Sequence, residues 1–322
     1  MTSSTAVAGA SRLRLVPPSR FADRAFYGIT LLSALAVAAL FILVAWLLYR
    51  GAHLSIAKFG WNFLVTSKWD PVSEEFGAWP FIYGTVVSSL IALLIAVPLS
   101  IGAAIFLTDL APLRLRQPLV SLIEMLAAVP SVIWGLWGVF VMVPWLRDHA
   151  FPLLKEYLGF LPLFQGPIYG VSMLAGGIVI AIMILPIVTS ISREILRAVP
   201  DLQREAAYAL GATRWEVTRI AVLSYARRGL LGAVVLGLGR AVGETMAVTM
   251  VIGNRPEVAK SLFAPGYTLA SVIANEFTEA TTDIYLNALF ELGLVLMGVT
   301  ILVNFLAFVL IRTTETPGSR RA

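Results

Sequence analysis

The 322-residue sequence contains no cysteine and only two histidines, His53 and His149. Without thiols the chain can form no disulfide, no cysteine-ligated cluster and no thiol nucleophile. Two isolated imidazoles leave almost no material for a multi-histidine metal centre or a Ser-His-Asp triad. The sequence therefore predicts no metal site and no catalytic residues, and it indicates a protein that is not an enzyme.

Charged residues are also scarce. They make up 13% of the chain, against about 25% in soluble domains, whereas 58% of the residues are hydrophobic and the mean hydropathy is +0.85. The net charge of +5 comes from basic residues scattered over loops, between apolar runs of about 20 residues. This pattern indicates a multi-pass membrane protein rather than a nucleic-acid-binding protein.

Six apolar stretches are long enough to cross a membrane as helices. They cover residues 26–49, 81–108, 119–145, 169–191, 229–253 and 286–311. The first is too long for the apolar core of a signal peptide, so we expect a retained anchor. The predicted fold class is an all-α polytopic membrane protein with six transmembrane helices.

Positive charge is unevenly divided among the segments between the spans. Of the 24 Lys and Arg residues, 16 lie in the N-terminal tail, near 109–118, in 192–228 and in the C-terminal tail. The other three loops hold 7, and Arg240 lies within a predicted span. Because basic loops stay on the cytoplasmic side, we predict that both termini are cytoplasmic.

The polar segment 200–224, set between two apolar stretches, has the local features of a helix-turn-helix. Asp201 is predicted to cap a first short helix. Gly211 is predicted to end that helix in a left-handed conformation. Thr213 and Glu216 have the spacing of a capping box that starts a second helix.

The tip of this segment is typical of a contact site for another protein. The small side chains of Ala206, Ala207 and Ala209 let a partner approach closely, and Glu205 offers a carboxylate. The alternative is a solvated connector whose alanines only favour helix.

The string EAAYALG, which begins at Glu205, resembles the cytoplasmic signature of the permease subunits of ATP-binding-cassette (ABC) importers. Glu205, Ala206, Ala207 and Gly211 match that signature, whereas residues 221–224 lack its Ile and Pro. The resemblance implies the type-1 permease fold of these importers. It also implies that the matching residues dock on a P-loop ATPase and transmit its closure to the spans.

The resemblance implies a division of the chain into four parts. These are a flexible cytoplasmic tail (1–25), a first transmembrane helix with a long outer loop (26–79), a permease domain (80–311) that includes the docking loop, and a second tail (312–322). The chain has no GxxxxGK[ST] motif with which to hold nucleotide phosphates. We therefore expect no cofactor on this chain, and ATP and Mg²⁺ on partner ATPase subunits.

Four ionisable residues lie inside predicted spans: Glu124, Arg240, Glu244 and Glu291. Such residues are costly in hydrocarbon and usually face a pathway or a partner. Arg240 and Glu244 are four residues apart, so on a continuous helix they share a face and can pair. The guanidinium suits a tetrahedral oxyanion, and the carboxylate can compete for it and weaken anion capture. A purely structural ion pair is the alternative.

The string GLGRAVGETMAV, residues 237–248, resembles the phosphate-importer (PstC-type) branch of these permeases. Its glycines at 237, 239 and 243 are expected to let a neighbouring helix pack closely. The resemblance implies a substrate pathway formed with Arg240 and Glu244.

Glu124, followed by AVPSV at 128–132 and by Gly135, also resembles that branch. Pro130 is expected to kink the third span. Glu124 is expected to line the pathway or to meet a cation, and a buried, protonated carboxyl is the alternative.

Together the resemblances imply a permease subunit of the bacterial plasma (inner) membrane that translocates inorganic phosphate by alternating access. The implied partners are a second homologous permease, two P-loop ATPase subunits and an extracytoplasmic phosphate-binding protein. The same architecture could instead carry sulfate or molybdate. A proton-coupled carrier that uses Glu124, Glu244 and Glu291 as a relay would leave the docking loop unexplained. An intramembrane hydrolase would need a base that the spans do not offer.

Overall fold

The computed structural model describes residues 20–313, and within that range the chain is built from helices, as the sequence predicts. The long helices are α1 (Arg20–Gly51), α4 (Trp79–Ile105), α5 (Leu113–Ala127), α9 (Met173–Arg197), α12 (Leu223–Gly243) and α15 (Asp283–Thr313). The short helices are α2 (His53–Phe59), α3 (Asn62–Val65), α6 (Ser131–Trp137), α7 (Val143–Trp145), α8 (Phe151–Leu158), α10 (Asp201–Ala209), α11 (Arg214–Glu216), α13 (Met246–Val251) and α14 (Leu269–Glu276). Single π or 3₁₀ turns are η1 (Phe106–Leu110), η2 (Gly138–Met142), η3 (Leu146–Ala150), η4 (Pro162–Phe164) and η5 (Val217–Val222).

Five of the described helices are long and apolar enough to cross a membrane. They are Asp23–Gly51, Trp79–Leu110, Met173–Arg197, Arg214–Gly243 and Asp283–Val309. A sixth span is formed by the pair Leu113–Ala127 and Ser131–Leu158, which is bent by 92°. Each of the six predicted spans thus has a counterpart, and the third is bent.

The chain divides after Leu47 into two units. The first contains most of α1, a continuous apolar helix that begins at Arg20, within the predicted N-terminal tail. The remainder of that tail and most of the C-terminal one fall outside the described residues. All sites discussed below belong to the second unit.

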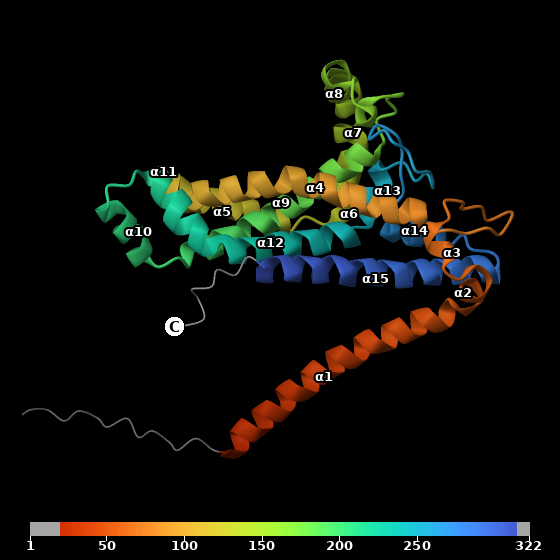
Figure 1. Ribbon diagram of the computed structural model, residues 1–322, viewed down its shortest axis with the longest axis horizontal. Helices are drawn as coiled ribbons and strands as arrows, with labels where there is room; N and C mark the ends of the chain where they lie inside the picture. Colours follow the sequence, from red (N-terminus) through yellow and green to blue (C-terminus); the bar gives the residue numbers. More distant parts are fainter. Residues whose placement is uncertain (1–19, 314–322) are drawn as a thin grey trace, which may run out of the picture. The chain divides into compact units, whose positions relative to one another are not determined.

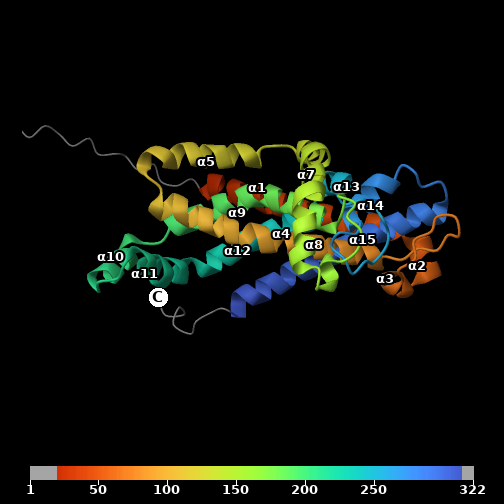
Figure 2. The same ribbon diagram turned by 90° about the horizontal axis from the view of Figure 1, so that it is seen from above.

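The core of the second unit is the packing of α4, α9 and α12 (Figures 1 and 2). A Cβ on Gly177 would lie 2.5 Å from the side chain of Ile91, so α9 and α4 meet closely there. A Cβ on Gly237 would lie 2.7 Å from Val188, which sets the approach of α12 to α9. These contacts bury α9 more fully than the other spans. Interfaces of small residues are typical of helix packing in membranes, because they let backbones approach.

Short helices and aromatic side chains close the end of this unit that lies away from α10. Trp69 packs edge-on against Phe76 and Phe81 with ring centroids 4.8 and 4.9 Å apart. The indole Nε1 of Trp69 donates to Glu276 Oε2 at 2.8 Å, and the Tyr285 hydroxyl donates to the same oxygen at 2.6 Å. Part of the segment predicted as an outer loop is therefore folded, with α2 and α3 as the short helices that its mixed composition allowed.

Candidate functional site

The docking segment is a short exposed helix, α10, at one end of the second unit (Figure 1). Glu205 and Ala206 are exposed, and Leu210, just after the helix, is 90% exposed. The prediction that Asp201 caps this helix is wrong, because the cap is Pro200 and Asp201 lies in the first turn without a capping hydrogen bond. Its charge still favours that end of the helix, since the first turn carries the positive end of the helix dipole.

The turn after α10 has the predicted geometry. Gly211 has a φ of +82°, a conformation that glycine adopts without strain. Thr213 and Glu216 form the predicted capping box: the Glu216 backbone N–H donates to Thr213 Oγ1 at 3.4 Å and the Thr213 N–H donates to Glu216 Oε2 at 2.8 Å. Both features are therefore confirmed, and they fix where the next helix begins.

That next helix does not stop at the membrane surface. It runs from Arg214 to Gly243, through α11, η5 and α12, as 30 residues of unbroken helix. At 1.5 Å per residue this is a rod of about 45 Å. The turn at Gly211 and α12 are thus joined by one continuous helix, which includes the π turn η5.

A buried ion pair anchors α10 to two of the spans. Arg204 Nη1 lies 2.7 Å from Asp109 Oδ1, with side chains only 20% and 13% exposed. Arg204 Nη2 also donates to the carbonyl of Leu196, near the end of α9, at 3.0 Å. The hydroxyl of Thr218, at the foot of the rod, donates to Asp109 Oδ2 at 3.3 Å. Asp109 follows α4 in η1, so one carboxylate ties α10, the rod and the end of α4 together.

The sequence analysis missed these tying residues. Asp109 lies just beyond a predicted span and Arg204 is 95 residues away. The available indication was a single carboxylate at the basic end of an apolar stretch, where it would be costly without a cationic partner. Its partner could not be chosen from the seven basic residues of 192–228 without the fold.

The third span is broken, not merely kinked. α5 ends at Ala127, residues 128–130 lie outside both helices, and α6 resumes at Ser131 at 92°. Proline removes a backbone donor and disfavours helix in the preceding residue, which explains the break at Pro130. Glu124, on α5, has a side chain 57% exposed and lies 3.8 Å from Arg193 Nη2 of α9. The alternative of a buried, protonated Glu124 is therefore wrong, and the predicted cationic neighbour is present.

The fifth span is broken as well, between α12 and α13. α12 ends at Gly243, Glu244 is extended (φ −68°, ψ 128°), and α13 begins at Met246. The prediction of one continuous span over 229–253 is therefore wrong. Arg240 and Glu244 do not share a helix face, and within residues 20–313 no salt bridge joins them. Arg240 is exposed and Glu244 is 9% exposed, so the pair that the spacing suggested is not formed.

The short helices beyond the two breaks pack against each other. A Cβ on Gly135 of α6 would lie 2.5 Å from Met250 Sδ and 3.1 Å from Ala247 Cα, and one on Gly138 would lie 2.7 Å from Val251. Because later residues of α6 meet later residues of α13, the two helices run in the same direction. The break before α6 and the break before α13 therefore lie at the same end of this pair of helices. Interrupted spans of this kind expose backbone groups where a transported solute can bind.

Of the three glycines in 237–248, only Gly237 makes the expected close helix contact. Gly239 has one ordinary contact, 3.9 Å from Asn304 Oδ1, and Gly243 faces open space. The surface of α12 that carries Arg240 is therefore left uncovered by the rest of this unit. Glu124, Arg240 and Glu244 come from different places along the two broken spans, and among the described residues no ion pair joins any two of them.

Among the residues that the structure describes, no cluster of three or more His, Asp or Glu side chains could hold a metal. What the structure does contain is a rigid rod that leads from an exposed docking helix to a pair of interrupted spans. This arrangement defines the class of protein as the membrane-spanning subunit of a transporter.

A family model described as "Binding-protein-dependent transport system inner membrane component" matches residues 96–315. The chain belongs to this family. It is therefore a multi-pass inner-membrane component of an ABC transporter and a transport subunit rather than an enzyme.

Curated relatives align along nearly the whole chain. A phosphate transport system permease protein PstC from Mesorhizobium japonicum is 47% identical over 307 residues, which are 93% of this chain and 94% of that protein. The PstC protein of Haemophilus influenzae is 47% identical over 294 residues, 89% of this chain and 93% of that protein. A probable PstC protein of Methanocaldococcus jannaschii is 39% identical over 284 residues, 86% and 90% of the two chains.

Among solved structures, a chain of the MetNI methionine ABC transporter in an inward-facing conformation aligns with a TM-score of 0.51 at 17% identity. The alignment covers 74% of this chain and 95% of that chain. At this identity the likeness shows the fold alone, that of an ABC importer permease.

Proposed function

We propose that this chain is the permease subunit of an ATP-driven importer of inorganic phosphate. The observation that carries the proposal is the joint presence of the exposed docking helix and the string around Arg240 in a chain 47% identical to PstC proteins along its length. The chain works with a second homologous permease, two ATPase subunits and an extracytoplasmic phosphate-binding protein.

The docking helix α10 is the part of the chain that receives movement from the ATPase subunits. Glu205, Ala206, Ala207 and Gly211 present an exposed, small-residue surface that fits a cleft of an ATPase subunit. Closure of that cleft moves α10, and the Asp109–Arg204 pair makes α4 and the rod follow. The exposed Leu210 adds apolar area of the kind that partners cover.

The two broken spans are the part of the chain that binds and releases the transported anion. Arg240 is a permanent cation on an uncovered face of α12, three residues before that helix ends. Its planar fork of N–H donors can bind two oxygens of a tetrahedral oxyanion at once. Glu244 lies at the break, so a movement that brings it toward Arg240 lowers the affinity for the anion. Capture and release then follow from differential binding in two states.

Reconstitution of the complete complex tests the proposal. The complex is placed in liposomes together with the binding protein, either with or without ATP inside. Uptake of labelled phosphate and of labelled sulfate is then measured. We expect uptake of phosphate that requires ATP and exceeds uptake of sulfate by about 100-fold, a difference of about 3 kcal/mol. Equal uptake of both anions would overturn the assignment of substrate. ATP-independent accumulation by this chain alone would overturn the assignment of an ABC importer and favour a proton-coupled carrier.

A further inference from the structure

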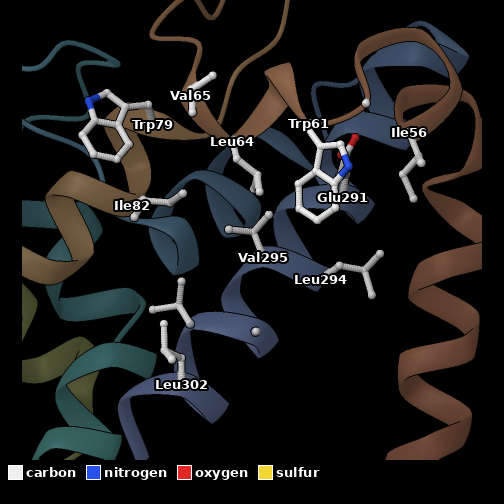
Figure 3. Close-up of a pocket in the computed structure, with 13 residues that line it drawn as sticks. Ile56, Trp61, Leu64, Val65, Trp79, Ile82, Glu291, Leu294, Val295 and Leu302 are labelled. Carbon is white, nitrogen blue, oxygen red and sulfur yellow. The ribbon is translucent and has the colours of Figure 1, made fainter. Parts of the chain in front are cut away.

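A long apolar groove runs along α15, beside α2 and α3 (Figure 3). Its volume is about 730 Å³. Trp61, Val65 and Trp79 form its rim, and Val295 and Leu302 form its floor. The rim is open to the surroundings, since Trp61 is 86% and Val65 68% exposed.

One charged residue, Glu291, lies in this otherwise apolar lining. Glu291, which the sequence places inside the last predicted span, is only 7% exposed and lines one end of the groove together with Trp61 (Figure 3). Among residues 20–313 its Oε2 has no hydrogen-bond partner of good geometry. The hydroxyl of Ser55 lies close to this carboxyl, but the two do not form a well-aligned hydrogen bond. A buried carboxyl oxygen without a donor is costly, so a donor from outside the chain would be stabilised there.

The length of the groove matches one leaflet of a membrane. From Glu291 to Leu302 there are eleven helical steps, or about 16 Å. Half of the hydrocarbon core of a bilayer is about 15 Å. Two tryptophans at the polar end, Trp61 and Trp79, have the position typical of indoles at the membrane interface. With Trp61 and Trp79 at the interface, a groove of this length reaches toward the middle of the bilayer, and Glu291 lies at its interfacial end.

These dimensions favour a lipid over a helix as the occupant. A helix that crosses the membrane needs about 20 residues and 30 Å, twice the length of the groove. A helix from another subunit would also need a buried donor aimed at Glu291. We propose that the groove binds a glycerophospholipid whose headgroup carries a primary ammonium, of the phosphatidylethanolamine type. The ammonium donates to Glu291, and an acyl chain lies along the apolar side of α15 toward Leu302.

A comparison of headgroups tests the proposal on the unaltered protein. The full-length chain, in the assembly in which it is purified, is titrated with phosphatidylethanolamine and with phosphatidylglycerol of identical acyl chains, and bound lipid is counted by native mass spectrometry. We expect about tenfold tighter binding of the ammonium lipid, because a charge-assisted hydrogen bond replaces a repulsion. Equal affinities for the two lipids would overturn the proposal.

Two variants separate the headgroup contact from the acyl-chain contact. Glu291→Gln is expected to bring the ratio of the two affinities to about one. Gly298→Leu, which fills the groove at a position where a Cβ meets nothing within 4 Å, is expected to abolish binding of both lipids. Gly102→Leu is the matched control, since Gly102 of α4 is also in open space and lies outside the groove. A preserved tenfold preference in Glu291→Gln would contradict the role of the carboxyl.

Access from the lipid phase distinguishes a lipid from a covering helix. Because the chain has no cysteine, Val295→Cys introduces a single thiol on the floor of the groove. In membranes this thiol is expected to react with an apolar maleimide supplied in the lipid, and added phosphatidylethanolamine is expected to slow the reaction. A thiol that is never labelled in the assembled complex would show that a protein segment fills the groove and would overturn the proposal. Neither result depends on phosphate transport.

Discussion

The docking end and the broken spans of this chain are built in opposite ways. At the docking end, helix is continuous for 30 residues and a single carboxylate, Asp109, holds Arg204 and Thr218. At the broken spans, helix stops twice, before Ser131 and after Gly243, and Arg240 stands exposed without a salt bridge among the described residues. One region has a continuous helix held by a paired carboxylate, and the other leaves Arg240 without an ion pair among the described residues.

This contrast teaches how one subunit can both receive a movement and release a solute. A helix that transmits a displacement must not bend along its length. Accordingly, the helix Arg214–Gly243 contains no Pro, and the Asp109 contacts that hold its beginning are largely buried. A binding site that must change state needs backbone and charged groups that are not permanently satisfied. The rod therefore ends at Gly243, three residues after Arg240, on which the transported anion is proposed to bind.

The largest effect is expected from breaking the lever. Gly232→Pro places a proline in the middle of the rod, where it removes a helical hydrogen bond and costs about 3 kcal/mol. We expect ATP hydrolysis by the complex to persist while phosphate uptake falls about 100-fold. Gly232→Ala is the control at the same position: a Cβ there meets nothing within 4 Å, so uptake is expected to be unchanged. Normal uptake by Gly232→Pro would show that the rod transmits nothing.

Reversal of charge at the docking surface comes next. Glu205→Arg is expected to weaken association with the ATPase subunits by about 2 kcal/mol, or about 30-fold, because the partner surface is arranged for a carboxylate. The amount of ATPase subunit that copurifies with this chain measures the loss of association. Gln203→Arg places the same arginine two residues away, on a different face of α10, with a change in net charge of +1 instead of +2, and is expected to have little effect. Equal losses in the two variants would point to net charge rather than to a specific contact.

The broken region is tested by Arg240→Lys, which keeps the charge and removes the planar fork. We expect kcat/KM for phosphate uptake to fall about tenfold, since one ammonium cannot replace two parallel hydrogen bonds. Arg255→Lys, in the segment after α13, is the control and is expected to behave like the wild type. Undiminished uptake in Arg240→Lys would argue against bidentate binding of the anion.

The polar tie at the docking end is expected to contribute less than the lever itself. Asp109→Asn keeps the shape of the side chain and removes its charge, which should cost about 1.5 kcal/mol at the partly buried pair with Arg204. We expect a lower Tm and about threefold fewer phosphate ions moved per ATP. If the number of phosphate ions moved per ATP is unchanged while Tm falls, the Asp109–Arg204 pair stabilises the fold but does not couple ATP hydrolysis to transport.

The smallest effect is expected where α6 meets α13. Gly135→Ala puts a methyl group against Met250, whose thioether can shift, and against the backbone of Ala247, which cannot. The cost is about 1 kcal/mol, or a fall in Tm of about 2–4 °C. Gly102→Ala introduces the same methyl group into open space and is expected to be neutral or slightly stabilising. Equal Tm values for the two variants would mean that the contact between the broken spans is loose.

The sequence predicted the features that depend on neighbouring residues. Apolar length located the spans, the conformational freedom of Gly211 located the turn, and the spacing of Thr213 and Glu216 located the start of the rod. It did not predict where helices stop inside the membrane. Apolar residues continue on both sides of Glu244, and the four-residue spacing of Arg240 and Glu244 predicts a shared helix face only if the helix does not break between them.

The remaining features depend on contacts far apart in the chain. The pairing of Asp109 with Arg204 spans 95 residues, and the burial of Glu291 depends on α2 and α3 folding over α15. Neither the pairing of Asp109 nor the burial of Glu291 can be predicted from the residues that neighbour them in the sequence. A charge at the edge of an apolar stretch is nevertheless a useful indicator, because Asp109 is paired with Arg204 and Glu291 faces a groove.

Accessibility of the break tests the central claim most directly. In a complex made otherwise free of cysteine, Thr245→Cys places one thiol between α12 and α13, and its reaction with a water-soluble maleimide is followed with and without trapped nucleotide. The account predicts a change in labelling rate of at least about tenfold on trapping, and loss of that change in Thr245→Cys combined with Gly232→Pro. A rate indifferent to nucleotide, or a change that survives the proline, would contradict it.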